Sequence, residues 1–71
     1  MERMYHIGVL KRKSTIVVQA STNVDCLSCE IRDYYGIRIT TKANLKANKL
    51  ALLSELKHDP YYKDCDCIVI E

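Results

Sequence analysis

The stretch MYHIGVLKRKSTIVVQA, residues 4–20, decides the fold because it holds two strand-like segments on either side of a basic break. Apolar and polar side chains alternate along residues 4–10, which predicts a strand with one apolar face. Residues 15–20 are rich in β-branched side chains, which favour a strand. The three basic residues between them, 11–13, predict a β-hairpin with a positively charged tip.

The next segment has the periodicity of a helix. Residues 24–35 place apolar and tyrosine side chains at helical spacing, so we predict a helix that begins after the N-cap candidates of residues 21–23. Gly36 follows at the position that a C-capping glycine takes. Residues 37–41 then alternate apolar and polar side chains, which predicts a short third strand.

A second helix is predicted over residues 44–58, where leucines recur on one face and Pro60 ends the pattern. Residues 65–70 form the last predicted strand. The order is β-β-α-β-α-β with short connections. We therefore expect a small α+β fold in which one four-stranded sheet has two helices packed on it. At this length, residues 1–71 are expected to form a single compact domain.

The composition fits a small globular protein. Of the 71 residues 48% are apolar, which argues against disorder, and the absence of Phe and Trp gives an aliphatic core. No apolar run reaches the length of a membrane span, and the N-terminus lacks a signal-peptide core. We therefore expect a cytoplasmic protein with reduced thiols and no membrane partner. Because so small a core is marginally stable, a homodimer is also compatible with the sequence.

Four cysteines, Cys26, Cys29, Cys65 and Cys67, are the one constellation that could carry chemistry. The first interpretation is that they pack as reduced thiols, since cysteine is often simply buried, and it implies no cofactor. The second is a tetrahedral zinc site of all four thiolates, although the C-x-C spacing of the second pair strains chelation. The third is a thiol redox pair at the C-x-x-C spacing of Cys26 and Cys29.

The net charge is only +2, but the positive residues are concentrated in the hairpin tip and in residues 38–57, which include the second predicted helix. The candidate binding residues there are Lys11, Arg12, Lys13, Lys42, Lys46 and Lys49. Lysine and arginine side chains neutralise phosphates, so these residues define a candidate nucleic-acid surface. Against this hypothesis, the sequence pI of 8.4 is below the value typical of nucleic-acid-binding domains.

The C-terminal quarter carries the opposite charge together with two tyrosines. Its candidate binding residues are Tyr61, Tyr62, Asp64 and Asp66. Tyrosine is enriched where proteins meet. The two tyrosines fit equally well in a core that lacks Phe, and the sequence does not separate the two interpretations.

No arrangement of residues predicts catalysis. The two histidines are isolated, there is no glycine-rich phosphate loop, and no acidic pair has the spacing of a shared substrate site. We therefore expect a non-enzymatic interaction protein that binds and modulates a larger macromolecular partner, as a regulator or a phage-type inhibitor of host machinery. The partner expected first is a protein. The alternative is a nucleic-acid-binding accessory protein that uses the basic hairpin tip and helix face.

Overall fold

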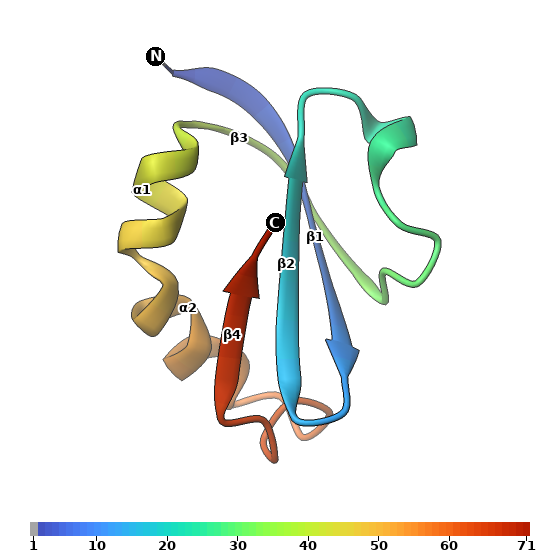
Figure 1. Cartoon of the computed structure of the whole chain (residues 1–71), viewed down its shortest axis with the longest axis vertical. Coiled ribbons are helices and arrows are strands. Elements are labelled where there is room, and N and C mark those ends of the chain that lie inside the picture. The colour runs from blue at the N-terminus through green and yellow to red at the C-terminus, as the bar shows by residue number, and fades with distance from the viewer. Residues whose placement is uncertain (1) are drawn as a thin grey trace.

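A four-stranded mixed sheet in the order β3-β1-β2-β4 forms the centre of the molecule (Figure 1). The computed structural model describes residues 2–71, so Met1 of the expected domain lies outside the described residues. The elements are β1 (Arg3–Arg12), β2 (Thr15–Ser21), the 3-10 turn η1 (Val24–Cys26), β3 (Asp33–Thr40), α1 (Lys42–Ala47), α2 (Lys49–Leu56) and β4 (Cys67–Ile70). The predicted α+β class, with two helices packed on one four-stranded sheet, is confirmed, but both helices come from the second of the two predicted helical segments.

β1 and β2 form the antiparallel hairpin that residues 4–20 predict, with Arg12 opposite Thr15. Lys13 follows β1 with a positive φ of 57°, which two-residue hairpin turns favour. β2 is a central strand and is buried on both faces. Its Ile16 and Val18 belong to the main core, whereas Val17 is buried on the opposite face.

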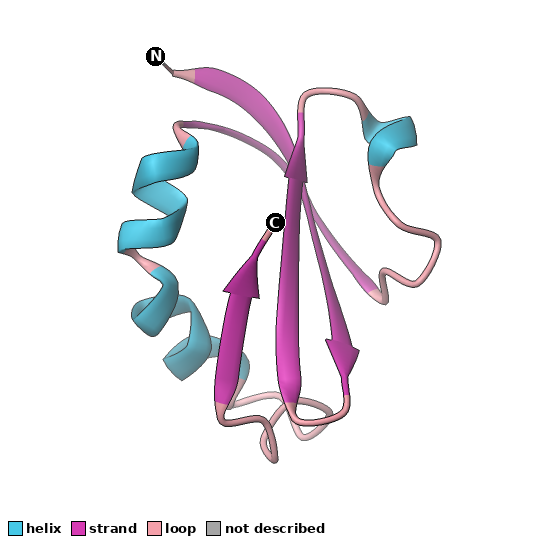
Figure 2. Ribbon diagram, in the orientation of Figure 1, coloured by secondary structure: helices cyan, strands magenta, loops and turns pink. Residues whose placement is uncertain are grey.

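The second predicted helix is present as two short helices, which lie on one face of the sheet beside β4 (Figure 2). Thr41 caps α1, because its Oγ1 accepts a hydrogen bond from the Asn44 backbone N–H at 3.0 Å. Asn48 separates α1 from α2. The helical side chains that contact the core are the buried Leu56 and the partly buried Leu45, Leu52 and Leu53.

The helix predicted over residues 24–35 does not form. The expected N-cap is present, but it caps only the 3-10 turn Val24–Cys26. Residues 27–32 continue as an irregular loop, and residues 33–35 belong to β3. Gly36 has the positive φ expected of a C-capping glycine, 83°, but it lies inside β3, where the register with β1 shifts.

The last strand is shorter than predicted. β4 begins at Cys67 rather than at Cys65 and pairs in parallel with β2. Ile68 lies in the core and Ile70 packs against it, so Cys67 and Val69 point outward. Within residues 2–71, no helix has the length and apolar character needed to cross a membrane.

Candidate functional site

The lysines of the predicted helix face lie on α1 and at the start of α2. Lys42, Lys46 and Lys49 are all exposed. α1 follows β3 directly, and the last residue of β3, Thr40, pairs with Arg3 at the beginning of β1. α1 therefore begins at the end of the sheet opposite to the hairpin tip (Figure 1). The two basic segments do not join into one surface.

Two of the three cations at the hairpin tip make intramolecular contacts. Lys11 Nζ donates a hydrogen bond to the Tyr61 carbonyl oxygen at 3.0 Å and lies 4.8 Å from the centroid of the Tyr61 ring. Arg12 forms ion pairs with Glu30 at 3.2 Å and with Glu71 at 3.9 Å. The hydrogen bond to Glu30 raises the pKa of the Arg12 guanidinium. A phosphate at Lys11 or Arg12 would have to compete with these contacts.

The two predicted tyrosines have different environments, although their rings pack edge to face with centroids 4.9 Å apart. Tyr62 is fully buried, and its hydroxyl donates a hydrogen bond to Asp33. Burial, followed by this hydrogen bond, raises the pKa of the Tyr62 phenol. Arg32 stacks over the Tyr61 ring at 4.0 Å. Tyr62 is therefore a core residue, and Tyr61 is the accessible member of the pair.

The two predicted aspartates lie beside the hairpin tip. Asp64 and Asp66 are exposed in the loop that precedes β4. The backbone N–H of Asp66 donates a hydrogen bond to the Ser14 carbonyl oxygen at 3.2 Å, which joins this loop to the hairpin turn. This end of the sheet therefore mixes cations and carboxylates, which weakens the field that it presents to a polyanion.

The four cysteines do not form a cluster, and all four are free thiols. Cys26, Cys29 and Cys67 are exposed, whereas Cys65 is buried in the core. In the part of the chain that the structure describes, residues 2–71, no group of three or more His, Cys, Asp or Glu side chains is arranged to hold a metal ion. The zinc hypothesis thus has no supporting geometry. Core packing accounts for Cys65 alone.

An exposed apolar patch, which the sequence did not predict, lies on the face of β1 and β3 that points away from the helices. The strand register pairs Met4 with Ile39, His6 with Ile37 and Gly8 with Tyr34, so these side chains share one face. We call the apolar members the outer patch: Met4, Tyr34, Ile37 and Ile39, which are 58%, 53%, 43% and 70% exposed. Contiguous exposed apolar side chains mark interaction sites on soluble proteins.

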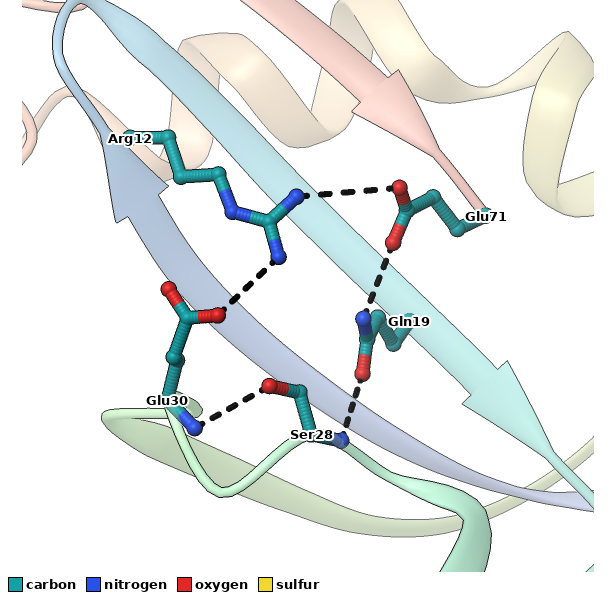
Figure 3. A network of polar contacts seen from close by, with 5 residues as sticks. All are labelled: Arg12, Gln19, Ser28, Glu30 and Glu71. Carbon is teal, nitrogen blue, oxygen red and sulfur yellow. Dashed lines mark hydrogen bonds and ion pairs between the residues drawn. The ribbon is translucent and has the colours of Figure 1, made fainter.

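A network of polar contacts holds the loop of residues 22–32 against the hairpin half of this same face (Figure 3). The Ser28 backbone N–H donates a hydrogen bond to Gln19 Oε1 at 2.8 Å, and Gln19 Nε2 donates one to Glu71 Oε1 at 2.9 Å. Glu30 accepts a hydrogen bond from Arg12 at 3.2 Å. Side chains from β1, β2 and the residue after β4 thus anchor the loop.

Apolar contacts beneath the loop complete its attachment. Ile31 lies so close to Gly8 that a side chain at position 8 would collide with it. Leu10 and Val17, which share this face by strand alternation, are both buried. The loop therefore covers the part of this face that is formed by β2 and by the end of β1 near the hairpin turn. It leaves open the part formed by β3 and the start of β1, which contains the outer patch.

Comparison of this chain with protein-family models, with curated proteins and with solved structures finds no match. The surfaces described above are therefore the basis for assigning a function.

Proposed function

We propose that the protein is a non-enzymatic interaction protein that binds and modulates a larger protein through the outer patch. The observation that carries the proposal is the exposure of four large apolar side chains on neighbouring strands, on a face that a loop otherwise covers. Burial of apolar surface on binding is favourable by about 25 cal/mol per Å². A small protein that occupies a partner's surface in this way acts as a regulator or as a phage-type inhibitor of host machinery.

The charges beside the patch indicate the chemistry of the partner. Arg38 lies next to Ile39 in β3, and Lys42 and Lys46 follow on α1. These cations lie on the helix side of the sheet, so they form a positive border at the end of β3 beyond Ile39 and not within the outer patch itself. Complementary interfaces place negative groups opposite such a border, which raises the association rate and selects the partner. The proposed partner is thus a protein with an apolar surface flanked by carboxylates.

Nucleic-acid binding is the alternative function, and the geometry favours it less. The contacts of Lys11 and Arg12 with Tyr61 and with carboxylates reduce the charge available at the hairpin tip. α1, which carries the exposed Lys42 and Lys46, begins at the opposite end of the sheet. A polyanion that used both groups would have to span the molecule, and its affinity would fall steeply with salt.

Capture of partners from a lysate of the cells that make the protein tests the proposal with matched variants. Met4→Asp places a charge in the outer patch, and Leu50→Asp places the same charge on α2 at a side chain that is 72% exposed. We expect the wild type and Leu50→Asp to capture the same partner protein in equal amounts. Met4→Asp should bind this protein at least about tenfold more weakly, the equivalent of about 1.4 kcal/mol.

Two results would contradict the proposal. Equal capture by Met4→Asp and by the wild type would exclude the outer patch as the binding surface. Loss of capture after nuclease treatment would assign the function to nucleic acid instead. Circular dichroism and urea unfolding of both variants provide the folding control, which both should pass because both substituted side chains are exposed.

A further inference from the structure

β3 is an edge strand with one side available for pairing. It spans eight residues, compared with four in β4, the strand at the opposite edge. An edge strand presents a row of N–H and C=O groups that no neighbouring strand uses. Over residues 37–40 the register with β1 is regular, from Ile37 opposite His6 to Thr40 opposite Arg3. This half of β3 therefore has the geometry on which a further strand can pair, and such a strand would displace the Arg38 side chain, which donates a hydrogen bond to the Ile37 carbonyl oxygen at 3.1 Å.

An apolar groove of about 560 Å³ runs between the same half of β3 and the helices. Its β3 wall contains Tyr35, Arg38 and Thr40, and its helical wall contains Leu45, Leu52 and Leu56. Buried side chains of β1 and β2 form the floor. The groove falls in the range of 300–1,000 Å³ that is typical of binding sites. A side chain that entered it from a strand beside β3 would meet mainly aliphatic groups.

The charges around the groove and its neighbouring helix are mainly positive. Residues 38–57 contain five basic side chains and one acidic side chain, a net charge of +4: Arg38, Lys42, Lys46, Lys49 and Lys57 against Glu55. Arg38 and Glu55 both line the groove itself, so the excess of positive charge lies beside it, where Lys42 and Lys46 are exposed on the helix that follows β3. An occupant with carboxylates beside its apolar side chains complements this charge.

We infer that the partner binds by strand addition: an extended acidic segment of another protein pairs with residues 37–40 of β3 and inserts an apolar side chain into the groove. The inference rests on the proposed function and specifies how the partner is recognised. Side chains of an added strand alternate between two faces. One row enters the groove beside Leu45 and Leu52, and the other row extends the outer patch beside Ile37. Backbone hydrogen bonds supply affinity, and the groove and the basic side chains supply specificity.

Titration of the purified protein with a synthetic peptide tests the inference directly. The probe is a peptide of the pattern Glu-Glu-Val-Tyr-Val-Leu-Val-Glu-Glu, compared with a version that has lysine for glutamate and a version with N-methylated backbone amides. Amide chemical shifts and hydrogen exchange of the labelled protein report the site. We expect the acidic peptide to bind about tenfold or more tightly than either control. It should also slow amide exchange within residues 37–40.

A pair of charge variants provides the matched control on the protein side. Arg38→Glu reverses a charge in the groove, and Lys63→Glu makes the same change in the exposed loop before β4, outside the group of cations around the groove. Arg38→Glu should weaken the acidic peptide by about tenfold and favour the lysine version, whereas Lys63→Glu should bind as the wild type does. Each variant's amide spectrum reports whether its fold is intact.

Three results would overturn the inference. The first is that the acidic peptide does not bind the wild type at about 1 mM, the weak end of recognition. The second is that the N-methylated peptide binds as tightly as the acidic peptide. The third is that the amide chemical shifts change only in elements other than β3. The same exchange measurement on a captured partner complex separates the two proposals. If a captured partner depends on Met4 but leaves exchange of residues 37–40 unchanged, strand addition is wrong and the outer patch remains the site. If the peptide result holds and no partner is captured, the proposed function fails instead.

Discussion

Replacement of Gly8 by alanine tests how the loop of residues 22–32 lies on the sheet. A Cβ built on Gly8 would lie 3.0 Å from Cγ2 and 3.1 Å from Cγ1 of Ile31, and closer still to its Cδ1. Ordinary contacts between carbon atoms are about 3.5–4.0 Å long. Ile31 must therefore move by roughly half an ångström or more, and the loop that carries it must loosen.

Two opposing effects set the size of the change in the Gly8→Ala variant. Overpacking of a filled site costs about 1–3 kcal/mol. Alanine also restricts the unfolded chain, which stabilises the folded protein by about 0.4–1 kcal/mol where φ is negative. Gly8 meets this condition, because Gly36 is the glycine with a positive φ. We expect the free energy of unfolding to fall by about 1–2 kcal/mol, or Tm by roughly 5–15 °C.

A double-mutant cycle with Ile31→Ala identifies the cause. Urea unfolding followed by circular dichroism gives the free energy of unfolding of each variant. In the Ile31→Ala background the collision is gone, so Gly8→Ala should be neutral or stabilising by about 0.4–1 kcal/mol. The reasoning is refuted if Gly8→Ala alone stabilises the protein, or if it has the same effect in both backgrounds.

Three further predictions concern the core, the helix cap and the thiols. Tyr62→Phe removes the hydrogen bond to Asp33 and should lower the free energy of unfolding by about 1–2 kcal/mol at neutral pH. Because the pKa of Tyr62 is raised in the folded state, the unfolded phenol ionises first, so wild-type stability should fall as the pH rises above 10.0. Urea unfolding at a series of pH values should show a smaller loss of stability for Tyr62→Phe than for the wild type. An equal dependence of stability on pH in the two proteins would contradict this. Thr41→Ala should cost about 1 kcal/mol by the same measurement, whereas Thr41→Ser should cost little because serine keeps the cap. With a thiol reagent, Cys26 and Cys29 should react fastest and Cys67 more slowly, since its hydrogen bond to Asp66 raises its pKa. The buried Cys65 should react only on unfolding, and a fourth fast thiol in the folded protein would disprove its placement.

The hairpin could be predicted from the sequence because its signals are local. Alternation before the basic residues and β-branched side chains after them lie within 17 residues, and the strands pair with each other. The second helix could be predicted for the same reason, since its leucines and its stop at Pro60 are close together in the chain. Its interruption at Asn48 gave no comparable signal.

The helix over residues 24–35 failed because distant groups outweighed its periodicity. The Ser28 N–H bonds to the side chain of Gln19, and the Arg32 N–H bonds to the Val9 carbonyl oxygen at 3.0 Å. Tyr34 pairs with Gly8 on the open edge of β1. Tyrosine favours strands where a pairing partner is available. A local pattern cannot show that such an edge exists.

The outer patch could not be predicted because it depends on which face the helices cover. Ile37 and Ile39 alternate with Arg38 and Thr40, which correctly predicts a strand with two different faces. The usual expectation is that the isoleucine face turns toward the core. In the structure it turns outward, and Arg38 lines the groove below the helices. The lysines of the helix face, in contrast, could be predicted, because their helical spacing alone places them on one exposed side of the helix.

The parallel pairing of β4 with β2 has a consequence for biosynthesis. Residues 67–70 leave the ribosome after every other element of the sheet, although they pair with its second strand. Until they arrive, β2 has an open edge beside Ile16 and Val18, two of the most deeply buried side chains of the finished protein. Open edges recruit strands from other chains. A pause in translation, or termination before Cys67, therefore leaves this edge of β2 open to pairing with a strand of another chain.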